Sequence, residues 1–452
     1  MQQKSILEDQ NIGKLLFKQS LPAIIGMFVM SLYNVVDAIF IGRQVGTVGI
    51  AGIAIAFPIQ MIVGAIGQMF GIGGASLLSR SLGAKKHKLA NKILGNVIAT
   101  ITVLSLAITI LGYIYLDKLL ILFGASATIL PYAKEYMQII LIGIFFHSLG
   151  MSLNNLIRAE GKAKTAMTTM ILSAIVNIVL DAVFIVGLKM GIKGAAIATL
   201  IAYFTGAAFL ASVYLSGRSV LRLRIREIRF DRYIQKEILA IGVSAFARQA
   251  AMSLLVILLN NTLGIYGGDM AIAVYGVVMR LVMLIFTPVM GISQGLQPIA
   301  GFNYGARDYK NTKKSVQIAM VASTIISIAG TLLLMLFPKF FLGVFSNDVH
   351  LLTTGESALR YIVLAFPTVG FHVIGTTLFQ AMGKASQTFI LTVSRQFLFL
   401  IPLVFILPKF FQLTGVWISF PIADILSVLL TLFLLIQLQN QFKQETQNTL
   451  EG

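Results

Sequence analysis

Apolar residues form long uninterrupted stretches along nearly the whole chain, separated by short polar or glycine-containing segments. About 20 consecutive apolar residues in an α-helix cross the hydrocarbon core of a bilayer, and every stretch reaches that length. None shows the ten-residue alternation of an outer-membrane barrel strand. The pattern therefore predicts an all-α polytopic membrane protein with twelve transmembrane helices, at roughly residues 15–41, 51–79, 93–116, 133–157, 166–188, 194–216, 238–264, 271–301, 315–338, 357–381, 387–408 and 413–437.

The two halves of this pattern repeat one another. The segment "SRSLGAKKHK" (79–88) is echoed by "GFNYGARDYK" (301–310), and "NNLIRAEGKAKTA" (154–166) by "TTLFQAMGKASQT" (376–388). In both pairs the matching glycines are 222 residues apart. Six helices per copy carry both copies across the membrane in the same sense. We therefore expect two six-helix bundles related by a pseudo-twofold axis along the membrane normal.

The repeat predicts the domain organisation. We expect an N-lobe over residues 1–216, a basic cytoplasmic linker over 217–236, a C-lobe over 237–440 and a cytoplasmic tail over 441–452. Two such bundles are typical of transporters that work by alternating access, with a substrate cavity near the middle of the membrane.

Composition and charge agree with this class. Hydrophobic residues make up 57% of the chain and charged residues 12%, which excludes an ordinary soluble protein. The absence of cysteine excludes disulfides and thiolate metal sites. With the N-terminus inside, the inner loops and tails hold 24 of the 35 lysines and arginines and the outer loops hold 8. This bias predicts a multi-pass protein of the bacterial inner (cytoplasmic) membrane with both termini cytoplasmic.

The net charge of +18 has the same explanation, so we expect no nucleic-acid partner. The arginine-rich linker is expected to lie on the anionic inner leaflet. The chain also has no nucleotide motor: "AEGKAKT" (159–165) lacks the upstream glycine of a phosphate-binding loop. Transport must then draw on an ion gradient, and we expect no cofactor apart from the coupling ion, H⁺ or Na⁺.

Only three of the seventeen acidic residues lie well inside predicted spans: Asp37, Asp181 and Asp424. A carboxylate at that depth costs roughly 2.5–3.5 kcal/mol on insertion scales. We therefore expect each of the three acids to have a functional or structural role. Tyr33 precedes Asp37 by four residues, and Asn177 precedes Asp181 by four. Residues at that spacing share one face of a helix.

The sixth span adds a hydroxyl, Thr199, to Asp37, Asn177 and Asp181. If the two acids are close and desolvated, they cannot both be ionised cheaply, so they would hold one proton between them. The same oxygens could instead bind Na⁺, a hard cation. A third interpretation is that each acid only ties helices together by hydrogen bonds.

The second half carries no equivalent acids. Aligning the repeats places Asn261 opposite Asp37 and Leu403 opposite Asp181. The carboxylates therefore belong to the N-lobe alone.

The spans of the C-lobe instead contain Arg248, Arg280 and Arg395. An unpaired arginine in lipid is very costly, so we predict a structural ion pair between Arg395 and Asp424. His147 and His372 are interpreted as hydrogen bonders in helix packing rather than as proton relays. The predicted substrate cavity consists of Met30, Tyr33, Asn154, Asn155, Arg248 and Asn261.

Several motifs, in this order, resemble those of the multidrug and toxic compound extrusion (MATE) transporters, and most closely the prokaryotic DinF-like or MepA-like branch. They include "LYNVVDAIFIG" (32–42), "NNLIRAEGKAKTAM" (154–167), "NIVLDAVFI" (177–185) and "QGLQPIAGFNYGA" (294–306). The resemblance covers roughly residues 11–437.

The resemblance implies a non-enzymatic exporter that exchanges organic cations and amphiphilic drugs for H⁺ or Na⁺ and acts as a monomer. It implies a cation site formed by Asp37, Asn177, Asp181 and Thr199, and a bend in the first helix at Pro22.

One position departs from the family pattern. Other branches have a glutamate in the seventh helix, where this chain has Arg248 at or beside the position. This favours coupling through the N-lobe.

Two alternatives remain open at this point. A flippase for a lipid-linked sugar precursor shares the architecture and would need a cationic cavity for pyrophosphate, which the C-lobe arginines keep open. A membrane enzyme is disfavoured because the chain has four scattered histidines, no cysteine and no acidic cluster on an outer loop.

Overall fold

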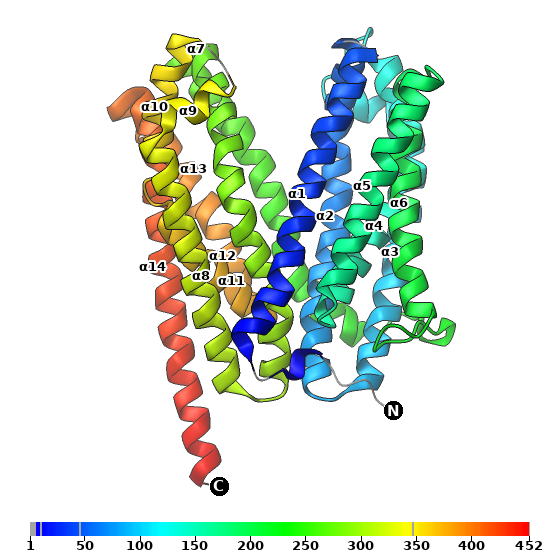
Figure 1. The fold of residues 1–452 in the computed structure, drawn as a ribbon, viewed down its shortest axis with the longest axis vertical. Coiled ribbons are helices and arrows are strands. Elements are labelled where there is room, and N and C mark those ends of the chain that lie inside the picture. Colours follow the sequence, from blue (N-terminus) through cyan, green and yellow to red (C-terminus); the bar gives the residue numbers. More distant parts are fainter. Residues whose placement is uncertain (1–5, 10, 45–46, 346–347, 452) are drawn as a thin grey trace. The chain divides into compact units, whose positions relative to one another are not determined.

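The computed structural model describes residues 6–9, 11–44, 47–345 and 348–451, and these residues form helices and short connections with no β-strand. The first half contains η1 (Ile6–Glu8), α1 (Ile12–Gln44), α2 (Thr47–Gly83), α3 (His87–Leu122), α4 (Leu130–Ala159), α5 (Ala163–Asp181), the π-helix η2 (Ala182–Gly187) and α6 (Gly191–Leu215). The second half contains η3 (Ile225–Glu227), α7 (Arg232–Gly305), α8 (Tyr309–Leu336), α9 (Pro338–Gly343), α10 (Val349–Val363), α11 (Phe366–Met382), α12 (Ala385–Val393), the π-helix η4 (Ser394–Leu400), α13 (Ile401–Ile406) and α14 (Pro408–Glu451). Figure 1 shows their order along the chain.

The helices account for the predicted number of spans. Among the described residues, ten helices are long and apolar enough to cross a membrane, and α10 and α11 form one more span with a 44° bend. The long α7 is two helices joined at Gly268, whose φ of 63° is not helical. Counting α7 as two gives the twelve spans predicted from sequence.

The chain divides into two compact units, which we call the N-lobe and the C-lobe from here on. The N-lobe contains Leu21–Phe246, and the C-lobe contains Asn11–Ser20 together with Ala247–Gly452. The units differ from the predicted lobes in two ways. The start of α1 belongs to the C-lobe, and both the linker and the start of α7 belong to the N-lobe.

Glycines explain this exchange of helix ends. At Gly73 of α2 the backbone of Ile238 in α7 approaches so closely that a Cβ would meet its carbonyl oxygen, and Gly242 of α7 meets Met69 of α2 in the same way. In the C-lobe, Gly295 of α7 lies equally close to Ser20 of α1. Gly73 and Gly295 are 222 residues apart. At equivalent positions, a glycine of each half thus allows close contact with the first helix of the other half, α7 at Gly73 and α1 at Gly295.

The connecting turns preserve the repeat. Lys85 after α2 has a φ of 58° and Arg307 after α7 a φ of 60°, a left-handed conformation that is uncommon outside glycine. Gly161 and Gly383, each before the next helix, have φ values of 83° and 77°. Both pairs are separated by the same 222 residues as the sequence motifs.

The linker is attached to the N-lobe along its length. The buried carboxylate of Glu160, at the α4–α5 turn, accepts hydrogen bonds from Ser219 Oγ at 2.6 Å and from Val220 N at 3.0 Å. From α3, the side chains of Asn91 and Asn96 accept bonds from the backbone of the linker. The predicted linker is thus a docked segment of the lobe.

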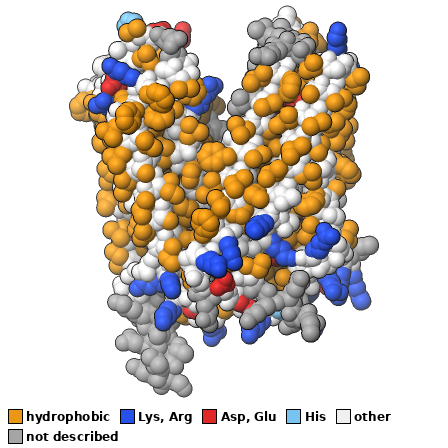
Figure 2. Space-filling view, in the orientation of Figure 1, with side chains coloured by type: hydrophobic (Ala, Val, Ile, Leu, Met, Phe, Trp, Pro, Cys, Tyr) orange, Lys and Arg blue, Asp and Glu red, His pale blue; other side chains and the backbone are white. Residues whose placement is uncertain are grey.

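Charged side chains lie toward the helix ends. On the face shown in Figure 2, hydrophobic side chains cover the middle of each unit. Lysines and arginines gather toward the end that bears the α2–α3 turn in one unit and the α7–α8 turn in the other. This is the distribution of a multi-pass membrane protein.

Candidate functional site

The two N-lobe carboxylates lie on neighbouring helices. Asp37 is partly buried on α1, and Asp181 is fully buried as the last residue of α5, where η2 begins. A π-helical turn widens the helix and leaves irregular backbone hydrogen bonding, and such turns often occur at functional sites. The sequence predicted the two acids but not the π-helix beside one of them.

The carboxyl groups of Asp37 and Asp181 lie close enough for their charges to interact. Two carboxylates this close in an apolar lobe cannot both be ionised cheaply. Among the described residues, both oxygens of Asp181, one of Asp37 and both polar atoms of Asn177 are buried without a hydrogen-bond partner. Buried polar groups are normally satisfied, so this cluster is suited to bind a proton or a small cation.

A shell of tyrosines and amides surrounds the acids. Tyr33 interacts electrostatically with both aspartates, and Tyr136 of α4 interacts with Asp37. Gln60 of α2 donates a hydrogen bond to the Tyr136 hydroxyl at 3.2 Å. Sequence reasoning missed Tyr136 and Gln60. A glutamine in the middle of an apolar span is itself a signal that could have identified α2 as part of the site.

Thr199 of α6 completes the predicted set. It is buried, and its side chain interacts with that of Tyr136. Tyr203, one turn further along α6, interacts with Asp37 and stacks on His147 with ring centroids 4.3 Å apart. The structure thus brings Asp37, Asn177 and Asp181 together and connects Thr199 to them through a tyrosine.

The cluster is suited to a monovalent ion. Its oxygens come from two carboxylates, an amide and hydroxyls, which fit H⁺ or Na⁺. Within the described parts of the chain, no three His, Cys, Asp or Glu side chains converge as a transition-metal site requires. His147 and Gln60 line a small pocket inside the N-lobe beside Tyr203.

The residues predicted to line a substrate cavity belong to both lobes and are described within each lobe. Asn154 does not fit that prediction, because it is 8% exposed and its amide donates to the carbonyl of Ala166, which ties α4 to α5. Asn155 is partly buried and bonds to Gln68 of α2 at 3.3 Å. Both asparagines therefore serve helix packing in this structure.

The other members of that set lie elsewhere. Met30 and Tyr33 are partly buried on α1, Arg248 is partly buried on α7, and Asn261 is exposed on the same helix. Pro22 is buried inside α1, two residues beyond the point where that helix leaves the C-lobe for the N-lobe.

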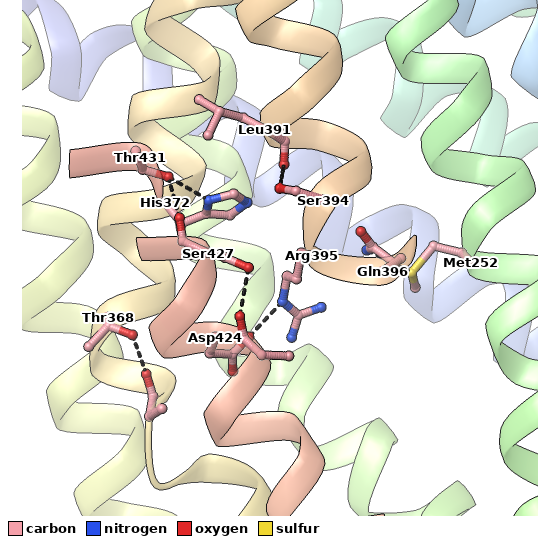
Figure 3. A network of polar contacts seen from close by, with 12 residues as sticks. Met252, Thr368, His372, Leu391, Ser394, Arg395, Gln396, Asp424, Ser427 and Thr431 are labelled. Atoms are coloured by element: carbon pink, nitrogen blue, oxygen red, sulfur yellow. Dashed lines mark hydrogen bonds and ion pairs between the residues drawn. The ribbon is translucent and has the colours of Figure 1, made fainter. Parts of the chain in front are cut away.

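A separate polar network occupies the C-lobe (Figure 3). Arg395 of η4 and Asp424 of α14 form an ion pair with Nε 2.6 Å from Oδ1. The Asp424 side chain is 2% exposed and that of Arg395 is 25% exposed. A further π-helix, η4, thus holds the arginine that the sequence analysis paired with Asp424.

His372 of α11 belongs to the same region. Its Nδ1 lies 2.8 Å from the Thr431 hydroxyl, which itself donates to the carbonyl of Ser427. Because the hydroxyl proton is committed, His372 donates from Nδ1. This is the packing role expected of it.

Comparisons with known proteins agree on one family. The family model described as MatE matches residues 22–183 and again residues 245–406, once in each half. The chain is 27% identical over 444 residues to the multidrug export protein MepA of Staphylococcus haemolyticus, covering 98% of both chains.

Solved structures give the same result. The MATE multidrug transporter DinF-BH, solved as a complex, is 43% identical with a TM-score of 0.89, covering 97% of this chain and 98% of its own. An outward-facing multidrug resistance MATE family transporter of the MOP superfamily is 27% identical with a TM-score of 0.91, covering 98% and 100%.

Proposed function

The chain belongs to the MatE family, and from this membership and the N-lobe geometry we propose that it is a secondary active multidrug efflux antiporter. It exports organic cations and amphiphilic drugs in exchange for H⁺ or Na⁺. The names of its relatives support the substrate class, since MepA is a multidrug export protein and DinF-BH is a multidrug transporter. The observation that carries the ion coupling is the cluster of unpartnered buried polar atoms on Asp37, Asn177 and Asp181.

The coupling follows from electrostatics in an apolar lobe. With one proton, or one Na⁺, the Asp37–Asp181 pair has a reduced charge and tolerates burial. Without it, two adjacent carboxylates repel each other, and their burial becomes costly unless water or another cation enters. Binding or release of the coupling ion therefore changes the charge that the lobe must bury, and this change links the ion to the conformation of the protein.

Pro22 provides a route from this charge to the conformation of the protein. Proline has no N–H, so α1 lacks the hydrogen bond from residue 22 to the carbonyl of Lys18. This weak point lies close to Ser20, where α1 passes from one lobe to the other. We propose that α1 bends here when the charge on Asp37 changes.

Orientation and assembly are part of the same proposal. Both termini face the cytoplasm, because lysines and arginines gather at that end of the helices. The chain acts as a monomer in the bacterial inner membrane, with two lobes that alternate access to each side and no cofactor other than the transported ion.

The test is drug transport by the purified protein in proteoliposomes. A fluorescent organic cation is followed under a pH gradient alone and under a Na⁺ gradient alone, with Asp37→Asn and Asp181→Asn as variants. We expect one gradient to drive transport, and both variants to bind the dye but fail to exchange it. Normal gradient-driven transport by Asp37→Asn would contradict the coupling role.

The same vesicles test the flippase alternative. A flippase would move a lipid-linked sugar pyrophosphate between leaflets whether or not Asp37 is intact. Of the C-lobe arginines that kept this alternative open, Arg395 forms an ion pair with Asp424 and Arg280 is exposed.

A further inference from the structure

Arg395 is a cation in the interior of a spanning helix, and part of it remains accessible. It lies in the span Ala385–Ile406, and a quarter of its side chain is exposed while its partner Asp424 is almost fully buried. A guanidinium in contact with hydrocarbon is prohibitively costly, so arginines in spans face protein or water. We therefore expect the exposed part of Arg395 to face water rather than hydrocarbon.

The ion pair leaves one edge of the guanidinium unused. Nε donates to Asp424 Oδ1, and this is the one bond drawn between the guanidinium and the carboxylate (Figure 3). In the described part of the chain, no side chain or carbonyl accepts a hydrogen bond from either Nη. Arginine commonly binds a carboxylate through two parallel N–H bonds, and here a complete pair of donors is free for a second oxyanion.

Asp424 orients the arginine and leaves net charge around it. The other electrostatic neighbours of Arg395 are the Tyr275 hydroxyl and His372, whose Nδ1 is occupied by Thr431. No second acid lies among these described neighbours. An approaching anion therefore meets a fixed positive edge rather than a neutralised pair.

We propose that the Nη edge of Arg395, held in place by Asp424, binds the carboxylate of amphiphilic substrates. The contact would make Arg395 a determinant of how tightly substrates that carry a carboxylate bind. It lies entirely within the C-lobe, apart from the N-lobe acids that bind the coupling ion. The inference rests on the export function proposed above, because it specifies what that function transports.

A matched pair of dyes tests the site. One is a cationic rhodamine methyl ester and the other is the same rhodamine with a free carboxylate. Their dissociation constants are measured by fluorescence anisotropy with the purified protein in nanodiscs of zwitterionic lipid. In the double variant Arg395→Gln/Asp424→Asn, a neutral pair of similar shape replaces the ion pair.

We expect the double variant to bind the acid at least about tenfold more weakly than the wild type, while the ester binds unchanged. Arg395→Lys keeps the charge without the paired donors and should give an intermediate loss for the acid. Equal binding of the acid by wild type and both variants would overturn the proposal.

Arg280→Gln is the matched control, since it removes an exposed arginine of the same lobe that forms no ion pair within the described residues. It should leave the ratio of the two affinities unchanged. An equal loss of acid binding in Arg280→Gln would indicate a diffuse positive field and would also overturn the proposal. Any effect of Asp37→Asn on the cationic part falls on both dyes, so the ratio of their two affinities should stay as in the wild type. Failure of ion coupling and failure of the carboxylate site therefore give different results.

Discussion

The two lobes share a fold but treat buried charge in opposite ways. In the N-lobe, Asp37 and Asp181 have each other as charged neighbours and keep several atoms unpartnered. In the C-lobe, Asp424 is held by Arg395 at 2.6 Å. A carboxylate beside a fixed cation remains ionised, whereas two carboxylates without one depend on a mobile ion.

The difference shows that the fold itself does not require either arrangement. The repeat counterpart of Asp37 is the exposed Asn261, and that of Asp181 is Leu403. The helix contacts that define each lobe persist without the acids. The paired acids are therefore a property of one half and not a requirement of the fold.

The largest effect is expected from moving the carboxylate between lobes. Asp37→Asn should abolish gradient-driven drug transport. Adding Asn261→Asp should not restore it, because Leu403 provides no second carboxylate there. Transport in proteoliposomes is the measurement, and dye binding controls for folding. Recovery in the double variant would show that either lobe can couple and would contradict the asymmetry.

Breaking the C-lobe pair should destabilise that lobe. Asp424→Ala leaves Arg395 without its partner and should lower the free energy of unfolding by about 3–5 kcal/mol. Trp417, the only tryptophan, is buried on α14 two turns from Asp424, so its fluorescence reports unfolding of this lobe. The charge-swapped variant Arg395→Asp/Asp424→Arg should recover part of the loss. No recovery would argue against a stabilising pair.

Glu160 offers a pH test at the α4–α5 turn, where the C-lobe counterpart is Met382. Burial raises the pKa of Glu160 to about 7, although hydrogen bonds from Ser219 and Val220 oppose the shift. The folded state then holds this proton more tightly than the unfolded chain, whose glutamates titrate near about 4.3. The contribution of this proton to the free energy of unfolding is fully present below about pH 4.3. It is lost as the pH rises to about 7.

Glu160→Gln should remove that pH dependence, because an amide oxygen still accepts both bonds and does not titrate. Between about pH 4.3 and about pH 7, the free energy of unfolding of the variant should rise relative to that of the wild type by at most about 1.4 kcal/mol per pH unit. Thermal unfolding in detergent across this range is the measurement. Glu160→Met, which copies the C-lobe residue, leaves both donors unpaired and should be destabilising at every pH. Parallel pH profiles for wild type and Glu160→Gln would exclude the buried titration.

The smallest effects are expected at Gly73 and Gly295, which occupy equivalent positions in the two lobes. Gly295→Ala places a Cβ against the backbone of Ser20 and should cost about 1–3 kcal/mol, and Gly73→Ala should cost a similar amount against Ile238. Gly276 of α7 has open space around its Cβ position, so Gly276→Ala is the control and should be neutral or slightly stabilising. Unequal losses at Gly73 and Gly295 would show that the exchange of helix ends is not equivalent in the two lobes.

The spans, the repeat and the family can be recognised without the structure. Hydrophobicity and turn chemistry are local properties, so twelve spans and the 222-residue offset could be derived from residue order alone. The same holds for the three intramembrane acids, because a charge in an apolar stretch stands out regardless of its surroundings. The pairing of Arg395 with Asp424 could also be predicted, since an arginine in a span requires a partner.

Which polar groups meet depends on the folded arrangement of the helices. Asn154 looked available for a substrate and is instead used between α4 and α5, whereas Tyr136 and Gln60 were overlooked and lie beside the acids. The start of α1 belongs to the C-lobe because Gly295 allows Ser20 to approach. Such contacts depend on the rotation and close approach of helices distant in the chain. Hydropathy does not record that rotation, because one apolar span fits lipid equally well in any orientation.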